Sequence, residues 1–197
     1  AGHLHVEHGE AADDFTATVA SFSTGLNSIV TGGNIDITAD GPADLGNSTA
    51  GGFIEVEAQS IAFVTLDAGD YVDLNATGTA PGEGVAGTTI LAGADVILAG
   101  NSVAVDSIAA GGSLSATGAD GPVAIGQASI AGNIGVFAAS DVTGVYNAGG
   151  DIALGSGADI VATANAAGGA PDPSNGDVLT AGNLFTDAAG DVVLTDS

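Results

Sequence analysis

Lysine and arginine are absent from this 197-residue chain, whereas aspartate and glutamate together number 24, which gives a formal net charge of -24. Such a chain cannot neutralise a phosphate backbone, and an anionic membrane surface would repel it. We therefore expect no nucleic-acid partner. The repulsion among the carboxylates must be relieved by spacing, by salt or by bound cations.

Cysteine, methionine and tryptophan are absent as well, and aromatic residues make up only 4% of the chain. The lack of cysteine excludes disulfides and thiol chemistry. No apolar run approaches the ~18 residues that a membrane-spanning helix needs, so we expect no membrane insertion. The hydrophobic residues, 45% of the chain, are mainly Ala, Val, Ile and Leu. This composition suits a narrow sheet interior.

Glycine, in contrast, is abundant, with 33 residues, and it begins a phrase that recurs along the chain. A glycine, often doubled, is followed by a polar residue and then by alternating aliphatic residues, as in Gly32-Gly33-Asn34-Ile35-Asp36-Ile37. The glycines that mark the successive copies lie 17 to 24 residues apart: Gly33, Gly52, Gly69, Gly93, Gly112, Gly132 and Gly150. A period near 20 residues indicates one structural unit stacked many times.

Each copy contains two or three short apolar runs separated by Gly, Asn, Asp and Ser, which are turn residues. This pattern predicts an all-β chain that turns two or three corners per lap and pairs in parallel with the lap below. We predict a right-handed parallel β-solenoid (β-helix) of about nine laps with a period near 19–20 residues. Residues 32–197 form its repeats. Residues 1–31 are expected to be a non-repeat N-terminal segment, acting as a cap or an intersubunit strand.

Two copies of the phrase are informative, the runs at residues 32–39 (GGNIDITA) and 148–155 (AGGDIALG). They resemble the repeats of filamentous-haemagglutinin-type proteins and other large bacterial surface adhesins, over most of residues 32–197. The resemblance implies an extracellular or cell-surface β-helix that serves as a rod, stalk or filament. It implies no catalytic residue.

Stacking the laps predicts an outward column of acidic side chains. Alignment of the inward aliphatic pairs places Asp36, Glu55 and Asp73 side by side, roughly 5 Å apart. Calcium, which binds carboxylate and carbonyl oxygens, would relieve their repulsion. The alternative is a solvated acidic stripe screened by salt. The same alignment stacks Phe53 on Tyr71, which we interpret as support for the sheet.

All three histidines lie near the N-terminus, at His3, His5 and His8. The start Ala1-Gly2-His3 offers an amine, two amides and an imidazole, a donor set that suits square-planar copper or nickel. The alternative is a terminal strand whose histidines face solvent or a neighbouring subunit. With no histidine elsewhere, no Ser-His-Asp set can form. Paired carboxylates without Trp, Lys or Arg are poor support for glycoside hydrolysis, so we expect no enzyme.

Asn or Asp follows the turn glycine in many copies, where its side chain can bond to the turn backbone. We interpret this position as structural, at Asn34, Asp95, Asn133, Asp151, Asp177, Asn183 and Asp191.

A solenoid exposes an open sheet edge at each end, and this chain stops within a copy of the phrase that starts at Gly190. We therefore expect a structural subunit that polymerises head to tail with itself into a surface filament or matrix fibre. The alternative is a rod segment of a large adhesin. Its loops at residues 77–84 and 166–175 would contact a host or surface glycan.

Overall fold

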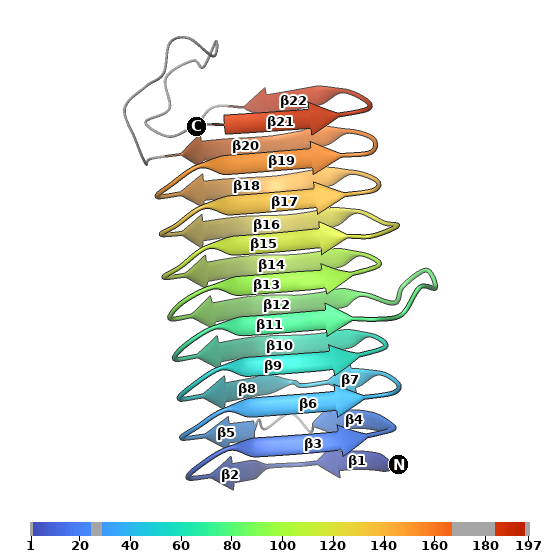
Figure 1. Ribbon diagram of the computed structural model, residues 1–197, viewed down its shortest axis with the longest axis vertical. Coiled ribbons are helices and arrows are strands. Elements are labelled where there is room, and N and C mark those ends of the chain that lie inside the picture. Colours follow the sequence, from blue (N-terminus) through green and yellow to red (C-terminus); the bar gives the residue numbers. More distant parts are fainter. Residues whose placement is uncertain (1, 25–28, 167–183, 196–197) are drawn as a thin grey trace.

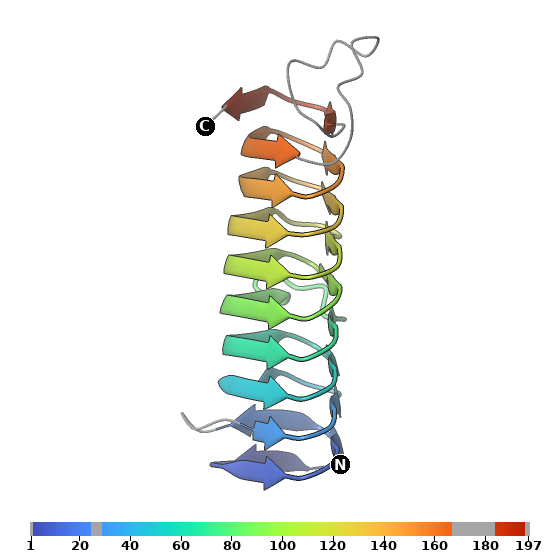
Figure 2. The ribbon, with the colours of Figure 1, turned by 90° about the vertical axis from the view of Figure 1, so that its left-hand side faces the viewer.

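The structure is a computed structural model that describes residues 2–24, 29–166 and 184–195. The described residues are built from short β-strands joined by turns, and no helix occurs among them. Figure 1 shows the strands wound into an upright coil, and Figure 2 shows its laps as parallel layers along the long axis. The predicted β-solenoid is thus confirmed.

One wall of the coil is a sheet in which nine strands are described, all paired in parallel. Five-residue strands suit this wall because their aliphatic residues alternate with polar or small ones, which buries one face only. Within the described chain this nine-stranded sheet contains β3 (Phe15–Val19), β6 (Ile35–Ala39), β9 (Ile54–Ala58), β11 (Val72–Ala76), β13 (Val96–Gly100), β15 (Leu114–Gly118), β17 (Ile134–Ala138), β19 (Ile152–Ser156) and β21 (Leu184–Ala188).

The remaining strands form a second parallel sheet, with thirteen strands in the described chain. Its main path is β1 (His3–Val6), β4 (Ser21–Thr24), β7 (Ala43–Asp44), β10 (Ile61–Ala68), β12 (Val85–Ala92), β14 (Val103–Ala110), β16 (Val123–Ile130), β18 (Val142–Ala148), β20 (Ile160–Ala166) and β22 (Val192–Thr195). Beside this path lie β2 (Gly9–Ala11), β5 (Ile29–Thr31) and β8 (Asn47–Ala50).

The chain alternates between the two sheets as it climbs. In Figure 1 the nearer strands β3, β6 and β9 point to the right, and the fainter strands behind them point to the left. A coil that rises in this sense is right-handed. Nine described strands in one sheet correspond to eight full turns between β3 and β21, close to the nine laps predicted.

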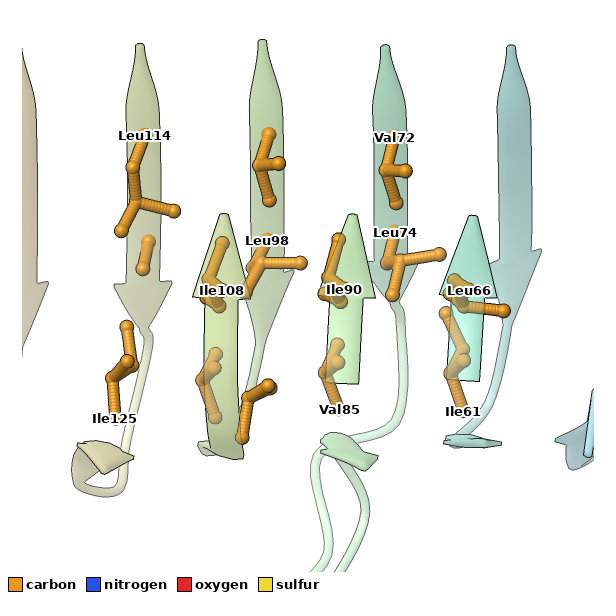
Figure 3. Close-up of a cluster of buried hydrophobic side chains, with 14 of the residues drawn as sticks. Ile61, Leu66, Val72, Leu74, Val85, Ile90, Leu98, Ile108, Leu114 and Ile125 are labelled. Atoms are coloured by element: carbon orange, nitrogen blue, oxygen red, sulfur yellow. The ribbon is translucent and has the colours of Figure 1, made fainter. Parts of the chain in front are cut away.

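The core is a set of aliphatic columns that run along the coil. Ile54, Val72 and Val96 occupy equivalent positions in successive laps and are fully buried. Figure 3 shows the same stacking for side chains from both sheets, among them Leu74, Leu98 and Ile90. Each buried aliphatic side chain contributes about 1.5–3 kcal/mol of transfer free energy, so the columns dominate the stability of the coil.

Close stacking of the turns explains the doubled glycine. A Cβ atom on Gly51 would lie within 3.0 Å of the carbonyl oxygen of Gly32, one lap below. A Cβ atom on Gly52 would likewise crowd the Asn34 side chain. Both contacts are shorter than real Cβ atoms tolerate, so a larger residue would push the laps apart locally.

The polar residue after the glycine has a structural role, as expected, and its partner is the turn backbone of the next lap. The Phe53 amide donates to Asn34 Oδ1 at 3.1 Å, and the Asp151 amide donates to Asn133 Oδ1 at 2.8 Å. The acceptor therefore serves the next lap and not its own turn. Asp177 and Asn183, expected to act in the same way, lie outside the described residues.

The described part of segment 1–31 contributes β1 to β5 to the same two sheets. β3 pairs in register with β6, with Phe15 opposite Ile35, and β1 pairs with β4. The same kind of hydrogen bond joins its turn to the next lap, because the Asn34 amide donates to Asp14 Oδ1 at 2.8 Å. The solenoid thus begins before Gly32, and a role of this segment as a cap or an intersubunit strand stays a prediction.

Candidate functional site

The acidic column lies on the outer face of the nine-stranded sheet. Asp36 pairs with Glu55, and Glu55 pairs with Asp73, in the register that the sequence predicts. Glu55 is exposed, whereas Asp36 and Asp73 are partly buried. Partial burial, followed by repulsion from Glu55, raises the pKa of the Asp73 carboxyl above its ordinary value.

An aromatic pair stands beside this column. The rings of Phe53 and Tyr71 stack at 4.9 Å with an interplanar angle of 12°, which confirms the predicted ladder. The Tyr71 hydroxyl donates to Glu55 Oε2 at 3.3 Å. Burial, followed by the neighbouring Glu55 carboxylate, raises the pKa of the Tyr71 phenol. The pair therefore orients Glu55 on the sheet surface.

No set of three or more His, Asp or Glu side chains converges as metal ligands within the described chain. The carboxylates of the column come from separate parallel strands about 4.8 Å apart, so they project side by side from the sheet. The calcium site at Asp36, Glu55 and Asp73 stays a prediction, which would require the side chains to turn toward a shared ion.

The N-terminal histidines lie on the edge strand β1 and just after it. The rings of His3 and His5 stack with centroids 6.4 Å apart, and their Nδ1 atoms lie 2.8 and 2.9 Å from the hydroxyls of Ser21 and Ser23. His8 instead faces Glu10, with Nε2 3.3 Å from Oε1. His3 and His5 are thus together and His8 is paired elsewhere. Ala1 lies outside the described residues, and the copper or nickel site stays a prediction.

The loop at residues 77–84 is fastened to the laps on both sides. Glu83 accepts hydrogen bonds from the Ala80 amide at 2.7 Å and from Gln59 Nε2 at 2.5 Å. From the next lap, Asn101 Nδ2 donates to the Thr79 carbonyl at 2.8 Å. Figure 1 shows this loop extending from the edge of the coil. Residues 167–175 of the second predicted loop lie outside the described residues.

The outer face of the nine-stranded sheet divides into two parts, a feature that the sequence reading missed. Its outward residues on β6, β9 and β11 include four carboxylates, Asp36, Glu55, Glu57 and Asp73. The outward residues on the next four strands, β13 to β19, carry no charge: Ile97, Ala99, Ser115, Thr117, Gly135, Phe137, Ala153 and Gly155. We call this second part the neutral face.

The last described lap exposes the interior of the coil. Val192 occupies the same column as Ile160 and is 44% exposed, whereas Ile160 is fully buried. Leu194 stands above Ala162 in the same way and is 40% exposed. These side chains are of core type, and no further lap of the described chain covers them.

The fold defines the class of protein as a parallel β-solenoid. Comparisons with protein-family models, with curated proteins and with solved structures found no match to this chain. The resemblance to filamentous-haemagglutinin-type adhesins therefore stays a prediction from the repeat pattern. Among the described residues, no helix is long and apolar enough to cross a membrane.

Proposed function

We propose that this protein is an extracellular structural subunit, a β-solenoid that joins end to end with further copies into a surface filament or matrix fibre. The observation that carries the proposal is the exposed interior at β22, where Val192 and Leu194 continue buried columns. An open parallel edge with core-type side chains is a template for another strand of the same kind.

The opposite end of the described chain offers a matching strand. β1 pairs with β4 on one side only, and its Leu4 stands in the column that leads through Phe22 and Ile61 to Val192. Adding β1 of a second copy to β22 would place Leu4 over Val192 and so cover the exposed column. In this arrangement the nine-stranded sheet would lack one strand at the joint, because β3 lies half a lap beyond β1.

The absence of Lys and Arg supports a role outside the cell, because trypsin-like proteases find no cleavage site. A dense negative charge also keeps neighbouring fibres apart laterally, while backbone pairing and apolar contact act at the ends. Salt would therefore favour assembly by screening the repulsion.

Light scattering of purified protein across salt and Ca²⁺ concentrations tests the proposal. We expect mass to grow with salt, and Val192→Asp to prevent growth by placing a charge in the joint. The matched control is Val64→Asp, because Val64 is exposed on the outer face of β10, six strands away from β22 in the same sheet. A wild-type protein that stays monomeric under all conditions would refute end-to-end assembly.

A second candidate function is a rod segment of a large adhesin that binds a host or surface glycan. The loop at residues 77–84 favours it, because hydrogen bonds of Glu83 and Asn101 tie the loop to the laps on both sides while its tip stays exposed. The mass of the native protein discriminates between the two functions. A parent molecule far larger than 18.5 kDa supports the adhesin.

A further inference from the structure

The ring of Phe137 lies against the neutral face. Phe137 pairs with Gly155 on the next strand, and a Cβ atom at Gly155 would collide with the Phe137 ring. The ring therefore covers Gly155, which is buried although it faces outward. Phe137 is nevertheless 50% exposed, so the other side of the ring faces solvent.

The surroundings of Phe137 are apolar or carry hydroxyl groups. Thr117 pairs with Phe137, and Ser115 stands two residues away on the same strand, both exposed. On the other side, Phe185 of β21 pairs with Ala153 and is 52% exposed. The two rings are separated by two strand spacings, about 10 Å along the coil axis. The two rings thus share one surface, with hydroxyl groups beside Phe137 and the Asp187 carboxylate on the same strand as Phe185.

We propose that the neutral face, together with Phe185, binds an extended neutral glycan whose sugar rings stack on Phe137 and Phe185. This inference rests on the second candidate function, glycan binding, and does not require end-to-end assembly. It places the ligand on the sheet face and not on the loop at residues 77–84. Sugar rings present flat C–H faces to an aromatic ring and hydroxyl groups to Ser115 and Thr117.

Charge favours a neutral ligand. An anionic polymer would be repelled by a chain of net charge -24, and a cationic partner would be drawn to the carboxylates on β6, β9 and β11. No outward residue of the neutral face itself is charged, and Asp187 of β21, which pairs with Gly155, is the one outward carboxylate on the described strands of this sheet from β13 to β21. Its oxygens can accept hydrogen bonds from the hydroxyl groups of a neutral sugar. A peptide would gain little, because the backbone groups of these inner strands are already paired within the sheet.

The size of the surface disfavours a second copy as the occupant. Five strands of five residues cover roughly 400 Å² at ordinary strand dimensions. Two copies packed face to face would bury about 800 Å² in total, below the ~1,200 Å² of a stable interface, and both would carry the same negative charge. A short stretch of glycan needs no larger area.

Depletion binding to microcrystalline cellulose and to chitin, two neutral β-linked glycans, tests the proposal. We expect wild-type protein to bind at least one of them, with affinity at least tenfold lower in Phe137→Leu, which keeps an apolar cover over Gly155 but has no ring. Phe185→Leu should weaken binding further. Leu91→Ala is the matched control, because Leu91 is an exposed apolar residue of the thirteen-stranded sheet.

Binding that is unchanged in both phenylalanine variants would place the glycan elsewhere, which refutes this site and leaves the glycan-binding function standing. If wild-type protein binds neither polymer, both the site and the proposed glycan function fail. Concentration-dependent mass that disappears in Phe137→Leu would instead assign the neutral face to a second copy and overturn the glycan assignment. Circular dichroism and thermal melting establish that each variant is folded.

Discussion

Removing one charge from the acidic column should stabilise the protein at neutral pH. In the column Asp73 has Glu55 on one side and the uncharged Ile97 on the other, so Asp73→Asn abolishes one carboxylate pair. Two charges about 5 Å apart repel by about 0.8 kcal/mol at the dielectric constant of water. Because Glu55 is exposed to solvent, the value for water applies to this pair. We therefore expect Asp73→Asn to raise the free energy of unfolding by about 1 kcal/mol at low salt.

The pH dependence has a definite sign. The raised pKa of Asp73 means that the folded state holds this proton more tightly than the unfolded state does. Its destabilising effect is therefore absent below the unfolded-state pKa and fully present above the folded-state pKa. Wild-type stability should fall as the pH rises through the acidic range toward neutrality, and Asp73→Asn should reduce this fall.

Urea denaturation from pH 4 to pH 8, at low salt and at 1 M salt, measures the effect. Asp67→Asn is the control, because Asp67 is exposed and its paired neighbours, Thr49 and Leu91, are uncharged. Salt should reduce the gain from Asp73→Asn by screening the pair. Equal gains for the two variants, or a loss of stability in Asp73→Asn at neutral pH, would refute repulsion within the column.

Three further predictions concern the core, the hydrogen bonds between successive turns, and the metal sites. Leu74→Ala should lower the free energy of unfolding by about 2–5 kcal/mol in thermal or urea melts, since Leu74 is fully buried; a loss below 1 kcal/mol would contradict the packing. Asn133→Ala should cost about 1 kcal/mol, because the Asp151 amide loses its acceptor, and Asn133→Asp should retain most of the stability. Calorimetric titration with Ca²⁺ should show binding that Glu55→Gln removes, and Cu²⁺ titration should show binding that His3→Ala removes. Absence of heat in either wild-type titration rejects the corresponding site.

The fold was predictable because its information is local and repeated. Each copy of the glycine phrase indicates where a turn lies and which residues face inward. Alignment of the aliphatic pairs was therefore enough to place Asp36 opposite Glu55. The predicted stack of Phe53 on Tyr71 follows from the same register. Contacts between laps of a solenoid repeat one nearest-neighbour contact. The period of the sequence is therefore enough to predict which residues of successive laps lie side by side.

The first lap was not predicted to be a repeat because its turn lacks the doubled glycine. Ala12 and Asp13 stand where later laps have Gly32 and Gly33, although Asp14 makes the same hydrogen bond to the next lap as Asn34. The sequence Asp14-Phe15-Thr16-Ala17 does carry the alternating pattern of a repeat, and it was the available signal. The neutral face was missed for another reason. The ring of Phe137 lies over Gly155, one lap away, and this contact appears only when every outward column is aligned.

Electron microscopy of the wild-type protein in salt tests end-to-end assembly most directly. Ten strand levels separate β1 of one copy from β1 of the next when β1 is added to β22. We therefore expect filaments with a strand spacing of about 4.8 Å and an axial subunit repeat of about 48 Å. Isolated rods of single-chain length, at concentrations and salt levels that favour association, would contradict it.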